Sequence, residues 1–178
     1  MATRPSVRNY KTGGANVYFA EWSGSAPPTL PDDYAHVGNC PQFATEPKFE
    51  KLIHKSSMGA VLEEDESRII ERSLNIKLSL DEIDVDNVAT FFGGVKDDEH
   101  TVRLLEAGTR TFAVKMASSD EQGPQWTIEL WKVELSGSGP VEWVTMNRYA
   151  KILLSGKVLS DAANHPTNRF GVGTLPSS

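Results

Sequence analysis

The sequence predicts a mainly β protein, a β-sandwich or curled β-barrel with one short α-helix on its flank. Within residues 68–80, apolar and polar side chains alternate strictly over about seven residues, which is the period of a half-buried strand. Proline, glycine and serine recur between short apolar segments, as the turns of an all-β protein require. Apolar residues have a clear helical spacing in one place, between residues 84 and 93.

The composition is that of an ordinary globular domain. The chain has 178 residues, of which 39% are apolar and 24% charged, and this is enough for one core. No apolar run approaches the roughly 20 residues that cross a bilayer, and no apolar stretch follows the first basic residues. We therefore expect neither a membrane anchor nor a secretory signal. Because Cys40 is the single cysteine, stability should come from packing or assembly rather than from a disulfide.

The first strands are predicted at 16–22, 35–37 and 42–54. The third of these alternates in part between an apolar row and a charged row, namely Phe43, Thr45 and Phe49 against Glu46, Lys48 and Glu50. Pro47 interrupts it without an N–H to donate, which favours a sheet edge or a bulge. Residues 55–67 are polar and acidic with no clear period, so we predict a long loop.

The strand at 68–80 is predicted to have one dry face and one wet face. The dry row is Ile70, Leu74, Ile76, Leu78 and Leu80, and the wet row is Glu71, Ser73, Asn75, Lys77 and Ser79. Arg72 interrupts the dry row near its start, where we expect the strand to leave the core.

A short helix is predicted at about 84–93. Asp84 or Asp86 can cap its first turn, and Gly93-Gly94 can end it. Its apolar stripe consists of Val85, Val88, Ala89 and Phe92. A helix of two to three turns cannot stand alone and must pack on the sheet.

Later strands are predicted at 101–106, 111–117, 126–135 and 148–159, with a hairpin turn at 107–109 joining the first two. Both parities of the 126–135 segment carry large apolar side chains, so we expect both of its faces to be buried, one of them against another subunit. We treat residues 1–178 as a single domain, with a flexible N-terminal arm at 1–14 and a C-terminal extension at 160–178.

The charge disfavours tight nucleic-acid binding. The net charge is −6 and no Lys/Arg cluster occurs, whereas affinity for DNA comes largely from neutralised phosphates. Mild acidity suits a conduit for DNA better than a reader of DNA. For the charge taken alone, a role in solubility is the favoured explanation.

We find no catalytic or metal-binding pattern, and we expect no enzymatic activity and no cofactor. The four histidines, His36, His54, His100 and His165, lie far apart without the spacing of a zinc site. Cys40 has no adjacent base. The acidic run Glu63–Glu66 lacks the alternation and the glycine of a calcium loop. Four tryptophans, Trp22, Trp126, Trp131 and Trp143, leave open a sugar-binding face, although core or interface positions are more common in β proteins.

Several segments, taken in order, resemble the major tail tube proteins of siphophages, the bacteriophages with long non-contractile tails. The resemblance covers about residues 16–95, and ILLSGKVLSD at 152–161 fits it more loosely. The matching strings are VYFAE (17–21), VGNCPQF (37–43), EKLIHKSSMGA (50–60), LSLDEI (78–83) and DVDNVATFFGG (84–94).

The resemblance implies a structural role in the virion, after synthesis in the host bacterial cytoplasm. Six subunits would close into a ring, rings would stack into a hollow tube, and the inner sheets would join into one barrel. DNA would pass through the lumen without specific binding, and the tape measure protein and the tail terminator and initiator proteins would be partners. The wet row Glu71, Ser73, Asn75, Lys77 and Ser79 would face the lumen.

The resemblance also implies contacts between rings. The loop at 55–67 would reach the adjacent ring. The candidate inter-ring residues are Arg4, Arg8, Lys11, Glu63, Glu64, Asp65 and Glu66. Two alternatives stay open at this point: the inner tube of a type VI secretion system or a contractile phage, which shares the fold, and a carbohydrate-binding β-sandwich.

Overall fold

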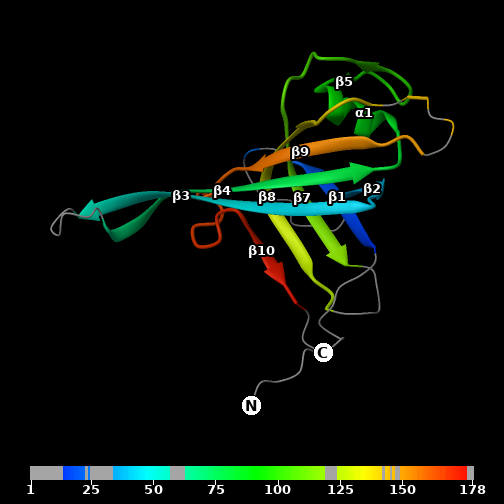
Figure 1. Ribbon diagram of the computed structural model, residues 1–178. Helices are drawn as coiled ribbons and strands as arrows, with labels where there is room; N and C mark the ends of the chain where they lie inside the picture. Colours follow the sequence, from blue (N-terminus) through cyan, green and yellow to red (C-terminus); the bar gives the residue numbers. More distant parts are fainter. Residues whose placement is uncertain are drawn as a thin grey trace.

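The computed structural model describes residues 14–22, 24, 34–56, 63–118, 124–141, 143–144, 146 and 149–175. The predicted N-terminal arm therefore lies outside the described residues, except for Gly14. One antiparallel sheet of eight strands dominates the described part, in the order β2-β1-β7-β8-β9-β4-β3, with β10 paired to β8 (Figure 1). The strands are β1 (Ala15–Glu21), β2 (Ala35–Asn39), β3 (Gln42–Ser56), β4 (Glu63–Leu80), β7 (Arg110–Ser118), β8 (Thr127–Gly137), β9 (Ile152–Val158) and β10 (Gly171–Thr174).

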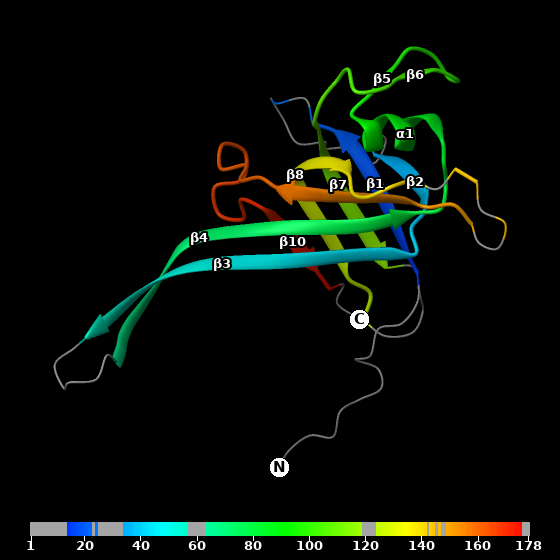
Figure 2. The same cartoon turned by 45° about the horizontal axis from the view of Figure 1, so that its top comes forward.

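The sheet folds over itself into two layers. In Figures 1 and 2, β3, β4 and β9 form one layer and cross over β1, β7 and β8 in the other. Apolar side chains from both layers fill the space between them, for example Ile76 and Leu80 from β4 and Val17 and Val114 from β1 and β7. This mainly β, sandwich-like architecture with one short helix confirms the predicted fold class.

The two edges of the sheet approach each other at one corner. β2 and β3 are the terminal strands of the sheet order, yet only Cys40 and Pro41 separate them in sequence. The side-chain amide of Asn87 is buried at this corner and donates to the carbonyls of Val37 (3.1 Å) and Glu82 (3.0 Å). The placement of β3 at an edge also explains why Pro47 is tolerated within it.

The helix α1 (Val85–Phe92) begins and ends as the sequence predicts. The Asp84 carboxylate accepts the backbone N–H of Asn87 at 2.7 Å, and Gly93 ends the helix at φ 56°. A Cβ at Gly93 would lie 2.3 Å from the carbonyl oxygen of Gly108, so only glycine fits. Val88 and Phe91 pack against the core, whereas Phe92 stacks on Trp143.

The predicted loop at 55–67 is wrong for residues 55–56 and 63–67, which are strand, and residues 57–62 lie outside the described residues. β3 continues to Ser56 and β4 starts at Glu63, and their pairing extends from Gln42↔Ser79 to Ser56↔Glu63. These strand ends could not be predicted from the sequence. No core covers them, so their side chains need not alternate between apolar and polar types. We call the projecting part of this hairpin, residues 49–56 and 63–72, the arm; it extends away from the body at the left of Figure 1.

One further prediction fails, and a strand that the sequence did not indicate occurs near the C-terminus. Residues 101–106 do not form a hairpin with the next strand; only β6 (Val102–Arg103) is extended, and it pairs with β5 (Val95–Lys96) in a separate two-stranded sheet. The segment 160–178 contains β10, which pairs along residues 127–130 of β8. Both β6 and β10 are short, and short strands leave little periodicity to detect.

Candidate functional site

The face of the sheet opposite the core carries a field of polar side chains. Cross-strand pairing aligns one row across five strands, and neighbours in such a row share a face. The row is Glu46, Asn75, Lys157, Glu134 and Thr111. The next row is Ala44, Lys77, Ser155 and Ser136. We call this surface the polar face.

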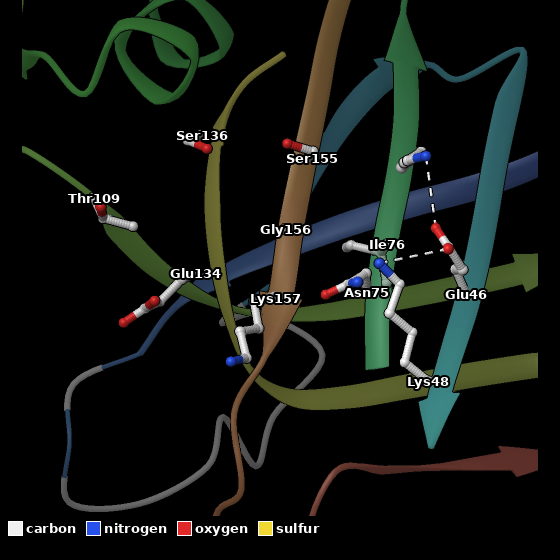
Figure 3. A pocket seen from close by; sticks show the side chains of 11 residues that line it. Glu46, Lys48, Asn75, Ile76, Thr109, Glu134, Ser136, Ser155, Gly156 and Lys157 are labelled. Carbon is white, nitrogen blue, oxygen red and sulfur yellow. Dashed lines mark ion pairs between the residues drawn. The ribbon is translucent and has the colours of Figure 1, made fainter. Parts of the chain in front are cut away.

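The polar face is hollowed into an open concavity of about 420 Å³ (Figure 3). Two carboxylates and three ammonium groups line it, from Glu46, Glu134, Lys48, Lys77 and Lys157. Glu46 lies between two lysines, with its oxygens 3.7 Å from Lys48 Nζ and 3.6 Å from Lys77 Nζ. These pairs are exposed, so each contributes little to stability. The result is a nearly neutral, water-facing wall without a dense cluster of one sign.

The structure places most of the predicted wet row on this face, with one exception. Lys77 is exposed, Ser73 and Asn75 are half-buried, and Glu71 is exposed where the arm leaves the body. Ser79 is 3% exposed, and its hydroxyl has no hydrogen-bond partner among the described residues. The prediction that Ser79 meets water is wrong, because this small side chain lies at the end of β4 between the longer Gln42 and Leu153 of the adjacent strands.

Several residues of the polar face were not singled out from the sequence. Ser155 and Lys157 alternate with the buried Ile152, Leu154 and Val158 of β9, so the period of two was available as a signal. Glu134 and Ser136 were hidden because both parities of β8 carry large apolar groups. Their place in the row depends on register with β9, which no local pattern specifies.

The candidate inter-ring residues lie at the far end of the arm where the structure describes them. Glu64, Asp65 and Glu66 are exposed on β4, and the Asp65 carboxylate is 2.6 Å from Nδ1 of His54 in β3. Glu63 belongs to β4, but its side chain is outside the described set. Arg4, Arg8 and Lys11 lie outside the described residues. The roles of all seven stay predictions.

The arm also exposes large apolar side chains. Phe49 is 57% and Ile70 56% exposed, and Leu52, Ile53 and Ile69 are exposed as well. Surfaces of this kind usually mark a contact with another molecule. A second concavity, of about 290 Å³ and lined mainly by apolar side chains, lies where the arm joins the body, between Leu74, Trp126, Ile128 and Phe170.

Other chemical groups in the described part are dispersed. No three His, Cys, Asp or Glu side chains gather there as metal ligands would. Burial raises the pKa of the Cys40 thiol, whose Sγ donates to the Gln42 carbonyl. The four tryptophans occupy separate settings: Trp131 stacks on His165, Trp143 on Phe92, Trp22 lies beneath Lys132, and Trp126 borders the apolar concavity. No helix among the described residues is long and apolar enough to cross a membrane.

Comparison with known proteins gives distant structural likenesses. No protein-family model matches the sequence, and no curated protein matches it. The chain is similar to a structure described as "Cryo-EM structure of the anti-feeding prophage cap (AFP tube terminating cap)", with 10% identity and a TM-score of 0.42, over 100% of this chain and 93% of that one. It is also similar to "Tail of empty GTA particle computed with helical refinement, C6 symmetry", with 13% identity and a TM-score of 0.34, over 91% of this chain and 95% of that one. At these scores neither likeness identifies a function.

Proposed function

We propose that this chain is a structural subunit of a bacteriophage tail tube, in which six copies form a ring and rings stack around a channel that conducts DNA. The observation that carries the proposal is the polar face, a sheet surface whose charges nearly cancel and whose side chains meet water. The ordered sequence resemblance to siphophage tail tube proteins, over about residues 16–95, supports the same reading.

A wall of this kind fits a conduit. The five charged side chains around the concavity carry a formal net charge of about +1, so phosphates passing over it meet neither strong attraction nor strong repulsion. A tight binder of DNA would instead concentrate cations on one face. Glu71, Ser73, Asn75 and Lys77 are the proposed lumen residues, joined by Glu46, Ser155 and Lys157.

Assembly suits the rest of the surface. β2 and β3 end the sheet order, and unpaired strand edges invite pairing that a closed ring would satisfy. The arm is a two-stranded ribbon with uncovered apolar groups, and such ribbons are marginal alone. We propose that the arm contacts an adjacent ring, with Glu63, Glu64, Asp65, Glu66, Arg4, Arg8 and Lys11 as candidate contacts. The tape measure, tail terminator and initiator proteins are proposed partners, in a virion assembled within the host cell.

Electron microscopy of the concentrated, purified chain tests the proposal directly. We expect hollow tubes or six-membered rings in negative stain, without an added initiator or with one. Compact particles with no central channel under both conditions would overturn the assembly part of the proposal.

Cysteine accessibility tests the lumen assignment. In Lys77→Cys, the new thiol should react with a small maleimide in both monomer and tube, but with a 5 kDa polyethylene-glycol maleimide only in the monomer. Thr167→Cys, on an exposed bend outside the polar face, the arm and residues 81–106, is the matched control and should react with both reagents in both states. The native Cys40 is buried and sets the background. Equal labelling of Lys77→Cys by the large reagent in tubes would place this face on the outside.

A related inner tube, from a contractile phage or a type VI secretion system, would present the same wall. The neighbouring genes discriminate, because a sheath gene accompanies a contractile tail and a tape measure gene without a sheath accompanies a non-contractile one.

A further inference from the structure

The negative charge of the chain is concentrated in one segment. Residues 81–106 contain eight carboxylates and two cationic side chains, a formal net charge of −6, which equals that of the whole chain. The remaining residues contain 16 of each sign and are neutral overall. This segment comprises α1, β5 and β6, and we call it the acidic cap.

The acidic cap also exposes leucine side chains. Leu104 is exposed, and Leu105 is 80% exposed at φ 63°, a left-handed conformation that is costly for a leucine. An asparagine or glycine would fit this backbone better and would not place an apolar group in water. A strained, exposed leucine among carboxylates has no evident role within the isolated fold.

The arm has a face of the complementary kind. Phe49 lies opposite Arg72, Lys51 opposite Ile69, and Ile53 opposite Ser67 in the β3–β4 ladder. Opposed residues share a face, and residues 49, 51 and 53 alternate in step with Phe43, which packs on the core. This inner face of the arm therefore continues the core-facing row into solvent. By the same pairing Lys55 and Glu64 lie on this face as well. Its charged groups are therefore Lys51, Lys55, Arg72 and Glu64, and neither Lys51 nor Arg72 forms an ion pair among the described residues.

The two surfaces lie at different ends of the molecule. In both Figures 1 and 2 the arm projects to the left, whereas α1, β5 and β6 lie at the upper right, beyond the body of the sheet. The inner face of the arm is thus placed to meet the acidic cap of another copy rather than its own. Two complementary patches at different ends of one chain generate head-to-tail contacts, which propagate into rings or helices.

We propose that the inner face of the arm of one copy docks on the acidic cap of a second copy, with Lys51 and Arg72 facing its carboxylates and Phe49, Ile53 and Ile69 covering Leu104 and Leu105. This contact rests on the proposed self-assembly and names the surface that the arm meets. Glu99 is a principal anionic partner because it forms no ion pair among the described residues. The Glu106 carboxylate is a second anionic partner, because it stays exposed while it pairs with Arg103.

A charge exchange tests the contact. K51E/R72E reverses two positive charges on the arm, and E99K/E106K reverses two negative charges on the acidic cap. Each variant alone therefore places like charges against each other across the contact. We expect the concentration for half-assembly, measured by sedimentation velocity, to rise at least roughly tenfold for each variant. An equimolar mixture should recover assembly, because each reversed arm then meets a reversed cap and each unchanged arm an unchanged cap. R169E reverses one charge on an exposed turn outside the arm, the acidic cap and the polar face, and it should assemble as the wild type does.

A substitution that relieves backbone strain separates docking from folding. Leu105→Asn suits the left-handed backbone, so the thermal midpoint of the monomer should stay the same or rise. Assembly should nevertheless weaken several-fold, because an apolar contact is lost. A purely structural leucine would give the reverse pattern, with a less stable monomer and unchanged assembly.

Zero-length cross-linking distinguishes this contact from the tube itself. Carbodiimide joins an amine to a carboxylate in direct contact, and mixed isotope-labelled and unlabelled chains report links between copies. A link from Lys51 to the cap, between copies, supports the docking even if no tubes form. Tubes that give links elsewhere but none from Lys51 to residues 81–106, or that tolerate both charge reversals, would overturn the docking while the proposed function stands.

Discussion

β3 and β4 run side by side along their full length, but their two halves differ in what surrounds them. In the body, β4 lies between β3 and β9, and Ile76, Leu78 and Leu80 are buried. In the arm, each strand has only the other as a neighbour, and Ile69 and Ile70 are exposed. The two halves contain the same type of apolar residue. The difference teaches that cover from a second layer, rather than residue type, decides which isoleucines form the core.

The arm consequently leaves apolar surface exposed to water. Burying an isoleucine side chain contributes about 1.5–3 kcal/mol relative to leaving it in water. The body has obtained this contribution on folding, whereas the arm can obtain it only by contact with another molecule. Each prediction below compares the covered region with the uncovered one.

The largest difference in the free energy of unfolding should appear between alanine substitutions of two isoleucines in the same strand, β4. Ile76→Ala removes a side chain that is 0% exposed and should lower the free energy of unfolding by about 2–5 kcal/mol, because a cavity remains. Ile70→Ala removes one that is 56% exposed and should change it by less than about 0.5 kcal/mol. Urea denaturation of the monomer measures both values.

The same pair should behave differently in assembly. Ile70→Ala is expected to raise the half-assembly concentration without destabilising the monomer. A loss of monomer stability in Ile70→Ala comparable with that in Ile76→Ala would mean that the arm packs on its own body, and the comparison would fail.

A buried hydrogen-bonded side chain of the body, Asn87, should also affect stability more than the exposed polar contacts of the arm do. Asn87→Leu removes the donor to the Val37 and Glu82 carbonyls at the corner between β2 and β3. We expect a loss of about 1–3 kcal/mol, because a buried acceptor at Val37 and a part-buried one at Glu82 lose their donor. Thr90→Val is a matched control in the same helix, since the Thr90 hydroxyl donates to the Asp86 carbonyl, an acceptor that the helix backbone already serves. Equal losses for the two variants would contradict the importance of the corner contact.

The sequence predicts the body better than the arm for a physical reason. Alternation from Leu74 to Leu80 records a constraint that the core imposes, and the polar face appears in the same alternation. Residues 63–67 experience no such constraint, so their strand is invisible to periodicity although the ladder continues through them. The capping of α1 by Asp84 and Gly93 was predictable because local backbone groups decide it.

What sequence reasoning could not supply is register over long separations. Glu134 joins Glu46 and Asn75 in one row only because β8, β9, β4 and β3 pair in a particular alignment. Burial of Ser79 depends likewise on Leu153 of β9, a residue 74 positions along the chain. The alternating pattern indicates a face for each strand, while the pairing of distant strands decides which side chains meet there.

The smallest effect is expected from the polar contact of the arm. The His54 and Asp65 side chains approach to 2.6 Å, yet both are largely exposed, and water competes for each group. Asp65→Asn should therefore change monomer stability by less than about 0.5 kcal/mol, as measured by urea denaturation at neutral pH. If the arm is covered in the assembled state, the same substitution has more effect there, because exclusion of water strengthens the contact. A loss above about 1 kcal/mol in the monomer would show that the arm is already covered before assembly, which is the opposite of what its exposed isoleucines indicate.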